Sequence, residues 1–473
     1  MGEYDVSRRS FLKGIGLAGL SAGTLGTLGA TGIAFADDAP VAESVDAYRQ
    51  LACETALVPV KKAACPGPRG PVGFEDRDIA ASDIASTEDC DIVVVGAGMA
   101  GLCTAVSAAE QGADVIVFSA SSKPISRGGS NHAIGSKYQK AKGIDYSPET
   151  AREIVKAEQT AGTYLMDKKK WERWINHSGE SIDWTIDHME KQGLKCCLEP
   201  GYYDPDGTIT VPPASHNFYT DEQPFGALYG APLEAQAYAD IFTGDFGGEI
   251  HYKTVAQYLI REDDNTGRVS GVVAQREDGS YVKYVANKAV VLATGDFSKN
   301  PDMMAKYSPW AWEHFKDALS FGDVDYDAEL VYSGLMPGDG QKMGMWIGAD
   351  MDEFACGDLW PFAAVMMDGT LPTTFEGTHF YAGVANLPVL MVDGAGRRLP
   401  FQSPSIPKLT CTPDGCAWSI WDSAWKEKFP EGGYMVEDYT ASNTQEEVDK
   451  NVENGITFKF DTIEELCEHC GFD

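Results

Sequence analysis

One segment constrains the fold of this chain more than any other. A β-branched run at residues 91–95 is followed at once by a Gly-x-Gly-x-x-Gly turn at residues 96–101. An apolar stretch at residues 102–111 and a second β-branched run at residues 114–118 come next. A strand, a glycine turn, a helix and a second strand make a βαβ unit of about 30 residues. We therefore predict an α/β fold that begins with parallel strands.

The residues of this turn have separate physical roles. Gly96 permits the tight turn, Gly98 lets the backbone approach a pyrophosphate, and Gly101 allows close packing of helix on strand. Met99 and Ala100 lie in the turn just before the expected helix, whose N-terminus carries partial positive charge that attracts phosphate. The turn predicts a dinucleotide-binding site. A glycine turn in an unrelated α/β protein is the alternative interpretation.

The acidic residue that usually accompanies this motif is replaced. At the end of the second strand, about 20 residues after the turn, a carboxylate normally holds the ribose hydroxyls. Ser119 occupies that place. A serine hydroxyl can bond to a ribose hydroxyl, but without the charge-assisted strength of a carboxylate. We expect a bound cofactor to contact Ser119 more weakly than it would an acid.

Composition excludes several classes of function. The chain has 473 residues, with 71 acidic against 38 basic side chains and a net charge of -33. Such an acidic surface disfavours nucleic acid and anionic lipid as partners. The 11 cysteines are too dilute for a disulfide scaffold. Cys467 and Cys470 are spaced like a redox or haem motif, but Gly471 stands where a c-type haem needs His, so we predict no metal.

The first 36 residues are typical of a targeting segment. Arg8 and Arg9 precede an uncharged run at residues 14–36 that ends in a small-x-small cleavage pattern. The run holds seven glycines, so it is a poor membrane anchor. Twin arginines in this position resemble the bacterial twin-arginine export signal. We expect export to the periplasm or cell envelope, a tether at residues 37–88 and a mature chain without a membrane span.

Four later motifs add to the glycine turn. They are a Gly-Gly-Ser-Asn loop at residues 126–131, a short strand at residues 251–256, an Ala-Thr-Gly strand end at 293–295 and Gly-Asp-Gly at 338–340. In this order they resemble the FAD-binding fumarate reductase and succinate dehydrogenase flavoprotein family. The resemblance implies FAD as the cofactor, bound by the glycine turn and Ser119 together with Ser126, Gly129, Ser130, Val255, Ala293, Thr294, Gly295 and Asp339.

The resemblance also implies an architecture. It predicts a Rossmann-like FAD-binding domain of the glutathione-reductase type at residues 89–348 and a partial α+β capping domain, which binds substrate, at residues 349–473. An insertion at residues 195–245 is expected to decorate the first domain. Members of the family normally continue beyond the helix that matches residues 461–470. We therefore expect their C-terminal return segment to be absent here.

The reaction of the family is hydride transfer from flavin to an activated C=C bond, with a protein acid protonating the neighbouring carbon. Its substrate-binding His-Pro pair is matched here by Trp360-Pro361, and its proton-donating arginine has no counterpart in residues 396–407. Losing two cationic groups points away from fumarate and toward an enone or acrylate. His379 and Tyr381 are candidate proton donors by chemistry, although packing roles in the capping domain are the favoured interpretation for each.

The sequence holds one dinucleotide motif. An NAD(P)H domain of its own is therefore not expected, and electrons should come from an external donor, a cytochrome or a quinol-linked protein, as in anaerobic respiration. The predicted function is an exported FAD-dependent oxidoreductase that acts on a small unsaturated acceptor. Two alternatives stay open: a truncated, non-catalytic flavoprotein fragment, and a dehydrogenase of the ketosteroid type.

Overall fold

The computed structural model of the chain describes residues 79–126, 131–161, 167–198, 202–203, 210–211, 213–222, 230–309, 312, 324–327, 336–351, 389–399, 417–428, 444–453, 455 and 457–472. Within these ranges no helix combines the length and the apolar character needed to cross a membrane. The expected signal segment and residues 37–78 of the expected tether lie outside them.

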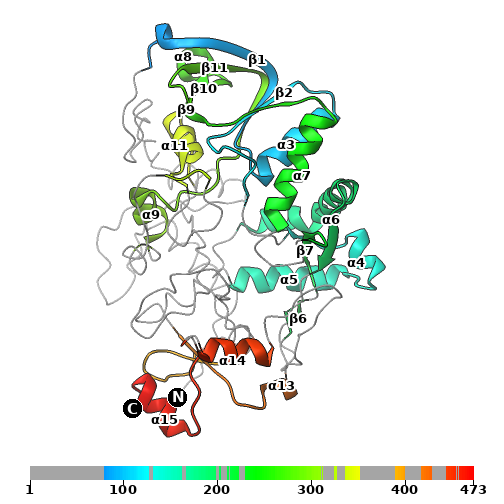
Figure 1. The fold of residues 1–473 in the computed structure, drawn as a ribbon, viewed down its shortest axis with the longest axis vertical. Helices are drawn as coiled ribbons and strands as arrows, with labels where there is room; N and C mark the ends of the chain where they lie inside the picture. Colours follow the sequence, from blue (N-terminus) through cyan, green and yellow to red (C-terminus); the bar gives the residue numbers. More distant parts are fainter. Residues whose placement is uncertain are drawn as a thin grey trace, which may run out of the picture. The chain divides into compact units, whose positions relative to one another are not determined.

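A mixed sheet of six strands forms the centre of the fold (Figure 1). Four neighbouring strands are parallel, and the last two pair antiparallel as a meander. In spatial order the strands are β8 (Glu249–His251), β2 (Val115–Phe118), β1 (Ile84–Val95), β11 (Tyr281–Leu292), β10 (Val269–Arg276) and β9 (Thr254–Arg261). The predicted α/β class with parallel first strands is confirmed.

Strand β1 is longer than the sequence pattern predicts. It begins at Ile84, inside the segment expected to be a tether, and pairs with β11 from that residue onward. Its first six residues alternate between half-buried and exposed, as in a strand with one solvated face. Only its last three residues are buried in succession. The hydrophobic run therefore indicates the central part of the strand but not its polar beginning.

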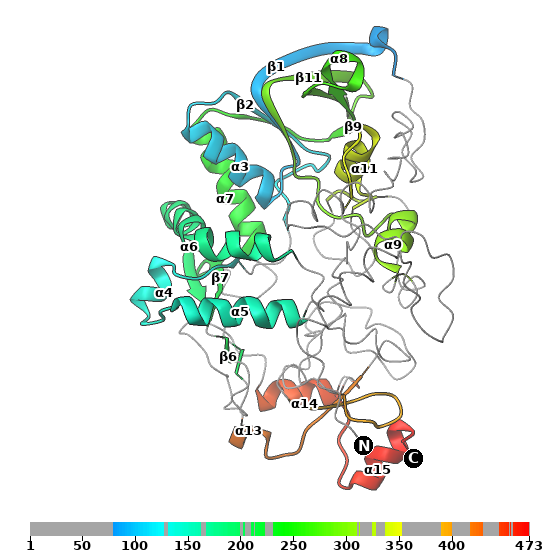
Figure 2. The ribbon, with the colours of Figure 1, turned by 180° about the vertical axis from the view of Figure 1, so that it is seen from behind.

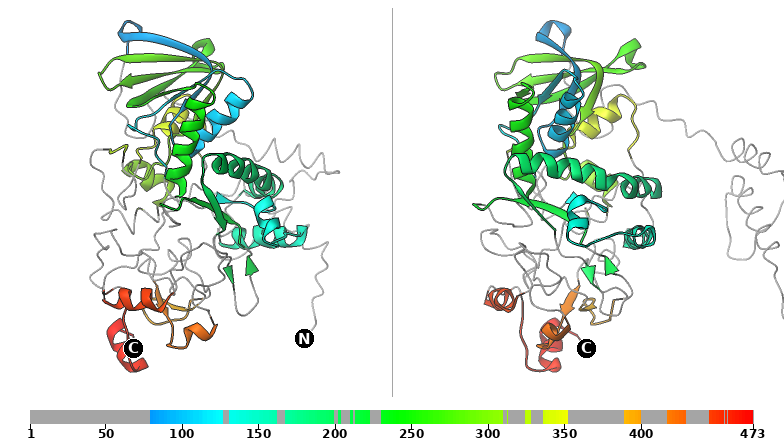
Figure 3. Two further views of the ribbon diagram at one scale, coloured as in Figure 1. Left: turned by 45° about the vertical axis from the view of Figure 1, so that its right-hand side comes forward. Right: turned by 90° about the vertical axis from the view of Figure 1, so that its right-hand side faces the viewer.

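One face of the sheet is covered by two helices, α3 (Met99–Glu110) and α7 (Gly230–Gly244), which pack against each other (Figure 3). Aliphatic and aromatic side chains fill this layer, including Leu102, Tyr238 and Phe242, all nearly fully buried. The expectation that residues 195–245 only decorate the domain is therefore wrong. Helix α7 is part of the core, because nine of its residues are buried.

On the opposite face, side chains of β1 and β2 pack against side chains of the meander strands and of α11 (Asp339–Trp346). The Phe118 ring stacks on Tyr284 with 4.7 Å between centroids. Met343 and Trp346 of α11 complete this second apolar layer. The two layers bury Val93 to Val95 on both sides, so the cofactor-binding end of β1 stands on a rigid base.

A smaller antiparallel sheet joins β3 (Asn131–His132), β7 (Ser215–Tyr219) and β4 (Lys195–Leu198), with three helices beside it (Figure 2). These helices are α4 (Lys137–Ala141), α5 (Pro148–Ala161) and α6 (Lys168–Lys191). The remaining elements are η1 (Ala81–Asp83), β5 (Tyr202–Tyr203), β6 (Thr210–Val211), α8 (Glu262–Asn265), α9 (Pro301–Tyr307), β12 (Leu390–Val392), β13 (Trp418–Ile420), α13 (Trp425–Lys428), α14 (Gln445–Glu453) and α15 (Ile463–Cys470).

Candidate cofactor-binding site

Three parallel strands end side by side at one edge of the sheet. Strands β2, β1 and β11 are neighbours, and backbone hydrogen bonds continue their pairing past their last residues. The N–H of Gly96 donates to the Phe118 carbonyl at 2.8 Å, and the N–H of Ala293 donates to the Val95 carbonyl at 2.8 Å. Ligands of open α/β sheets bind at this carboxyl edge. The structure thus brings Gly96, Ser119 and Ala293 together.

Close backbone contacts leave little or no room for a Cβ atom at the three glycines of the turn. Gly96 has φ +113°, and a Cβ there would lie 2.2 Å from the carbonyl oxygen of Ala293. A Cβ on Gly101 would lie 1.9 Å from the Gly96 oxygen, and one on Gly98 would lie 3.1 Å from the Ile125 oxygen. The strand-to-helix turn predicted for residues 96–101 is confirmed. Its glycines let three chain segments meet where a dinucleotide would approach.

The N-terminus of α3 is open toward this edge. Its N-cap is Gly98, with φ -86° and ψ -179°, and no side chain caps the helix. No acidic residue lies in its first turn. Met99 is half-buried and Ala100 is exposed. Free N–H groups and the helix dipole together form a site for phosphate oxygens.

Ser119 belongs to a hydrogen-bond network at the end of β2. Its hydroxyl lies 2.8 Å from the Ser121 hydroxyl, which in turn donates to the Lys123 carbonyl at 2.8 Å. The Ser119 backbone bonds to His251 and to Thr254, at 2.9 Å and 2.8 Å. Ser119 is therefore rigidly placed and only 8% exposed. Its hydroxyl already has a protein partner, which leaves less capacity for a ribose.

The Ala293-Thr294-Gly295 segment follows β11 and contacts the start of α11. The Thr294 hydroxyl accepts a hydrogen bond from the Gly340 N–H at 3.0 Å, and the Gln341 amide donates to the Gly295 carbonyl at 2.9 Å. A Cβ on Gly340 would lie 2.3 Å from the Thr294 hydroxyl oxygen. The glycine therefore allows the helix to begin against this strand end, and Thr294 serves as its capping group.

Asp339, in the first turn of α11, is held by two donors. Its carboxylate lies 3.0 Å from the Lys342 ammonium and accepts a hydrogen bond from the Tyr326 hydroxyl at 3.2 Å. Lys342 is 3% exposed, and burial lowers its pKa while the ion pair with Asp339 opposes that shift. The pair fixes the Asp339 carboxylate in place. A cofactor hydroxyl can bond only to its remaining lone pairs.

The other predicted contacts are distributed around this edge or lie outside the described residues. Ser126 is half-buried and follows Ile125, whose N–H donates to the Ala97 carbonyl at 3.1 Å. Val255, half-buried on β9, accepts a hydrogen bond at its carbonyl from Gln257 at 3.0 Å. Gly129, Ser130, His379, Tyr381 and the Trp360-Pro361 pair lie outside the described residues. Their predicted roles stay predictions.

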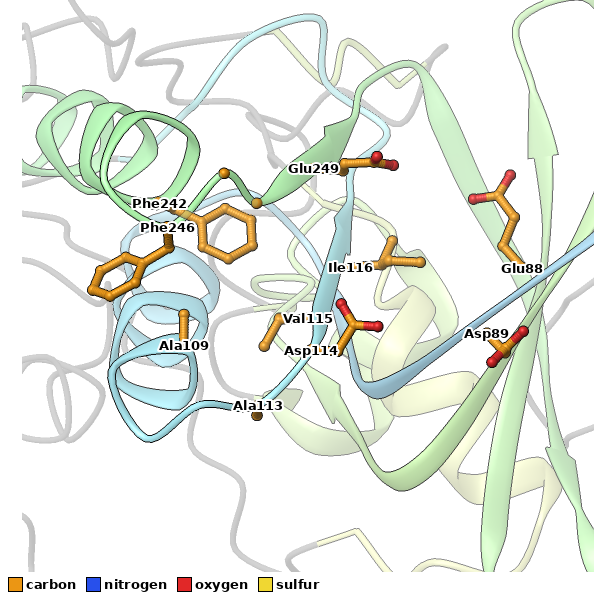
Figure 4. A pocket seen from close by; sticks show the side chains of 12 residues that line it. Glu88, Asp89, Ala109, Ala113, Asp114, Val115, Ile116, Phe242, Phe246 and Glu249 are labelled. Carbon is orange, nitrogen blue, oxygen red and sulfur yellow. The ribbon is translucent and has the colours of Figure 1, made fainter.

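A cavity of about 480 Å³ lies near the other end of the parallel strands (Figure 4). Its lining includes carboxylates from the middle of β1, from the residue before β2 and from the beginning of β8, together with aromatic rings of α7 and of the loop after it. These residues are Glu88, Asp89, Asp114, Glu249, Phe242 and Phe246. None of the predicted cofactor residues lines it. Four carboxylates would repel phosphate, so this cavity does not suit a dinucleotide.

One notable residue near the glycine turn was not predicted. Glu234 of α7 is fully buried, and its Oε1 accepts a hydrogen bond from the Asn131 amide at 2.8 Å. Its Oε2 is buried and has no hydrogen-bond partner among the described residues. Burial raises the pKa of this carboxyl to about 8, and the Asn131 bond opposes the shift. A single acid in an alanine-rich helix gives no pattern that would have indicated this.

The turn with three glycines, the N-terminus of α3 without a side-chain cap and the neighbouring strand ends fit the pyrophosphate of a dinucleotide cofactor. Comparison with known families agrees, because the FAD binding domain family matches residues 91–426. The chain therefore belongs to this family of FAD-binding oxidoreductases, and its cofactor is FAD. The carboxyl edge of the sheet, with the glycine turn at its centre, supplies the residues that would hold it.

Characterised relatives are distant. The chain is 26% identical over 325 residues to the vinyl phenol reductase of Lactiplantibacillus plantarum, which covers 67% of this chain and 57% of the relative. It is 25% identical over 430 residues to the digoxin reductase of Eggerthella lenta, covering 83% of this chain and 69% of the relative. The match therefore spans little more than half the length of the first of these relatives.

A solved structure shows the same fold. The 3-ketosteroid-delta4-(5alpha)-dehydrogenase of Rhodococcus jostii superposes with a TM-score of 0.56 at 22% identity, covering 84% of this chain and 77% of that chain. At this identity the likeness concerns the fold alone. The predicted FAD-binding domain of the glutathione-reductase type with a second α+β part is the fold class to which the chain belongs.

Proposed function

We propose that this protein is an exported FAD-dependent oxidoreductase that reduces the activated C=C bond of a small organic acceptor. The observation that carries the proposal is the cofactor edge, where glycine backbone, the α3 N-terminus and the Thr294–Gly340 contact meet. Bound FAD would supply the ring that transfers hydride. The chain would hold its phosphates through the first amide groups of α3 and fix the ring by the rigid ends of β1 and β11.

The names of the relatives support this reaction class. They include reductases of vinyl phenol and digoxin, and an NADH:acrylate oxidoreductase of Vibrio harveyi that is 24% identical over 432 residues. Vinyl phenol and acrylate are small molecules whose C=C bond is conjugated to an electron-withdrawing or aromatic group. An acceptor of the enone or acrylate type is proposed in preference to fumarate because Trp360-Pro361 replaces the His-Pro pair and the proton-donating arginine has no counterpart in residues 396–407.

The electron donor is proposed to be a separate cytochrome or quinol-linked protein in the periplasm or cell envelope. One dinucleotide turn occurs among the described residues, and FAD would occupy it. Arg8 and Arg9 before the glycine-rich run support export by the twin-arginine route. That route transports folded proteins, so the cofactor would be bound before export.

An anaerobic assay with a reduced dye tests the proposal. The purified holoprotein and reduced methyl viologen are mixed, in separate reactions, with acrylate, vinyl phenol, digoxin, a 3-ketosteroid enone and fumarate. We expect dye oxidation with one of the conjugated acceptors and none with fumarate. Dye oxidation only with fumarate would contradict the substrate class. Bound flavin without turnover on any acceptor would favour a non-catalytic flavoprotein.

Two substitutions test the candidate proton donors. His379→Ala and Tyr381→Phe each remove one acid while leaving hydride transfer from the ring possible. If either group supplies the proton to the carbon next to the one that receives hydride, kcat should fall by about 10²- to 10⁴-fold in its variant, as is usual for the loss of a general acid. Flavin content, read from the visible spectrum, is expected to stay unchanged. Equal loss of flavin and activity would instead indicate a packing role.

A further inference from the structure

Glu234 is a buried carboxyl group without a charged partner. Its side chain is 0% exposed, its Oε1 accepts from Asn131, and its Oε2 has no partner among the described residues. No lysine or arginine forms an ion pair with it in the part of the chain that the structure describes. Isolated buried carboxylates are so unfavourable that the group becomes neutral instead. Burial without a charged partner therefore favours the protonated form of Glu234 and raises its pKa to about 8.

The groups that face Glu234 offer no compensation for a negative charge. The Cys103 thiol of α3 faces this carboxyl, and burial is the main cause of its raised pKa. The Cys196 thiol of β4 also faces this carboxyl, and burial is the main cause of its raised pKa. Tyr238 lies one turn further along α7, and burial is the main cause of its raised pKa. Asn131 of β3 is the remaining contact and is uncharged.

This carboxyl also lies close to the first turns of α3. Cys103 of α3 faces Glu234, lies four residues after Met99, and donates through its thiol to the Ala100 carbonyl at 3.4 Å. Helices α3 and α7 pack closely along their lengths. An ionised Glu234 would therefore place a negative charge, in a medium of low polarity, near the helix end that receives the two phosphates of FAD.

We propose that Glu234 is a positioning residue that must stay protonated for FAD to bind, so that FAD binding takes up one proton at this carboxyl in alkaline solution. In the neutral acid, Oε1 holds the Asn131 amide and no charge opposes the phosphates. In the ionised form, repulsion between Glu234 and the phosphates weakens binding. A ligand that binds one protonation state better must shift the titration toward that state.

Calorimetric titration of FAD into the full-length apoprotein tests this without any substrate, so its outcome is separate from that of the proposed reaction. Measurements at pH 7 and pH 9, each in two buffers of different ionisation enthalpy, count the protons taken up per FAD. We expect a value near zero at pH 7 and approaching one at pH 9. The dissociation constant should rise by up to about tenfold per pH unit above the carboxyl pKa.

Two variants identify the group responsible. Glu234→Gln keeps the shape of the neutral acid, so it should bind FAD as the wild type does at pH 7 and take up no proton at pH 9. Asp240→Asn removes the same charge from an exposed position of the same helix and should leave the wild-type uptake unchanged. Proton uptake that persists in Glu234→Gln would overturn the proposal. So would a wild-type dissociation constant that does not change between pH 7 and pH 9, whatever the variants do.

Discussion

Replacing Gly101 by alanine should weaken both the fold and its hold on FAD. A Cβ on this residue would lie 1.9 Å from the Gly96 carbonyl oxygen, whereas ordinary contacts begin near 3.4 Å. The helix and the turn would have to separate by about 1.5 Å. The contacted atom belongs to the backbone, and the N–H of Gly96 donates a hydrogen bond to the Phe118 carbonyl. Neither the turn nor the helix can therefore move freely.

The size of the effect follows from two opposing contributions. Alanine in place of glycine favours a helix by up to about 1 kcal/mol. Forcing an extra group into a packed site costs about 1–3 kcal/mol, and more where backbone must shift. The unfolding free energy should therefore fall by about 2 kcal/mol. Thermal unfolding should occur several degrees lower, and FAD should bind at least about tenfold more weakly because the turn is displaced.

Gly244→Ala is the matched control for this measurement. Gly244 also lies in a helix, at the exposed end of α7, and a Cβ there would meet no atom within 4 Å. It gains the same kind of helix propensity without the collision, so its unfolding temperature should stay the same or rise. The reasoning about the turn would be refuted if Gly101→Ala melted no lower than Gly244→Ala and bound FAD with wild-type affinity.

Two further changes test the packing around the site. Asn300→Ala removes the N-cap of α9, whose side-chain oxygen accepts from the Met303 N–H at 3.1 Å, and should lower the unfolding free energy in denaturant titrations by about 1–2 kcal/mol. His216 is fully buried with Nε2 at 2.8 Å from the Ser136 hydroxyl, and burial lowers its pKa to about 4, so acid must destabilise the fold. The measurement uses the Glu234→Gln variant, because the titration of Glu234 would change stability in the opposite direction. In this variant the unfolding free energy should fall by up to about 1.4 kcal/mol per pH unit between pH 6.5 and pH 5. An unfolding free energy that does not change over this range would contradict a neutral buried imidazole.

The sequence alone predicted the cofactor turn because its determinants are local. Gly96 and Gly101 are required by contacts within a strand, a turn and the helix that follows, and that order is written in about 30 consecutive residues. The position of Ser119 at the end of the second strand follows from chain order, whereas that of Ala293 was implied by the family resemblance. The contacts of these residues with FAD stay predictions.

Long-range packing explains what the sequence did not predict. Residues 195–245 were expected to be peripheral, because their polar loops hide a helix whose burial depends on α3. Strand β1 begins at Ile84 because a β11 partner nearly 200 residues later pairs with its polar half. Neither partner can be inferred from the hydrophobic pattern of the segment itself, since a half-exposed strand resembles a linker in composition.

Ser119 and Glu234 together bear on how this chain can hold FAD. The position that usually supplies a negative charge to the ribose has an uncharged serine, which is already bonded to Ser121. A buried acid lies instead near the helix end that faces the phosphates, where it must remain protonated. Affinity should therefore depend more on the backbone amides of α3 than on side-chain charge. It should also decline at alkaline pH, because ionisation of Glu234 acts against those amides.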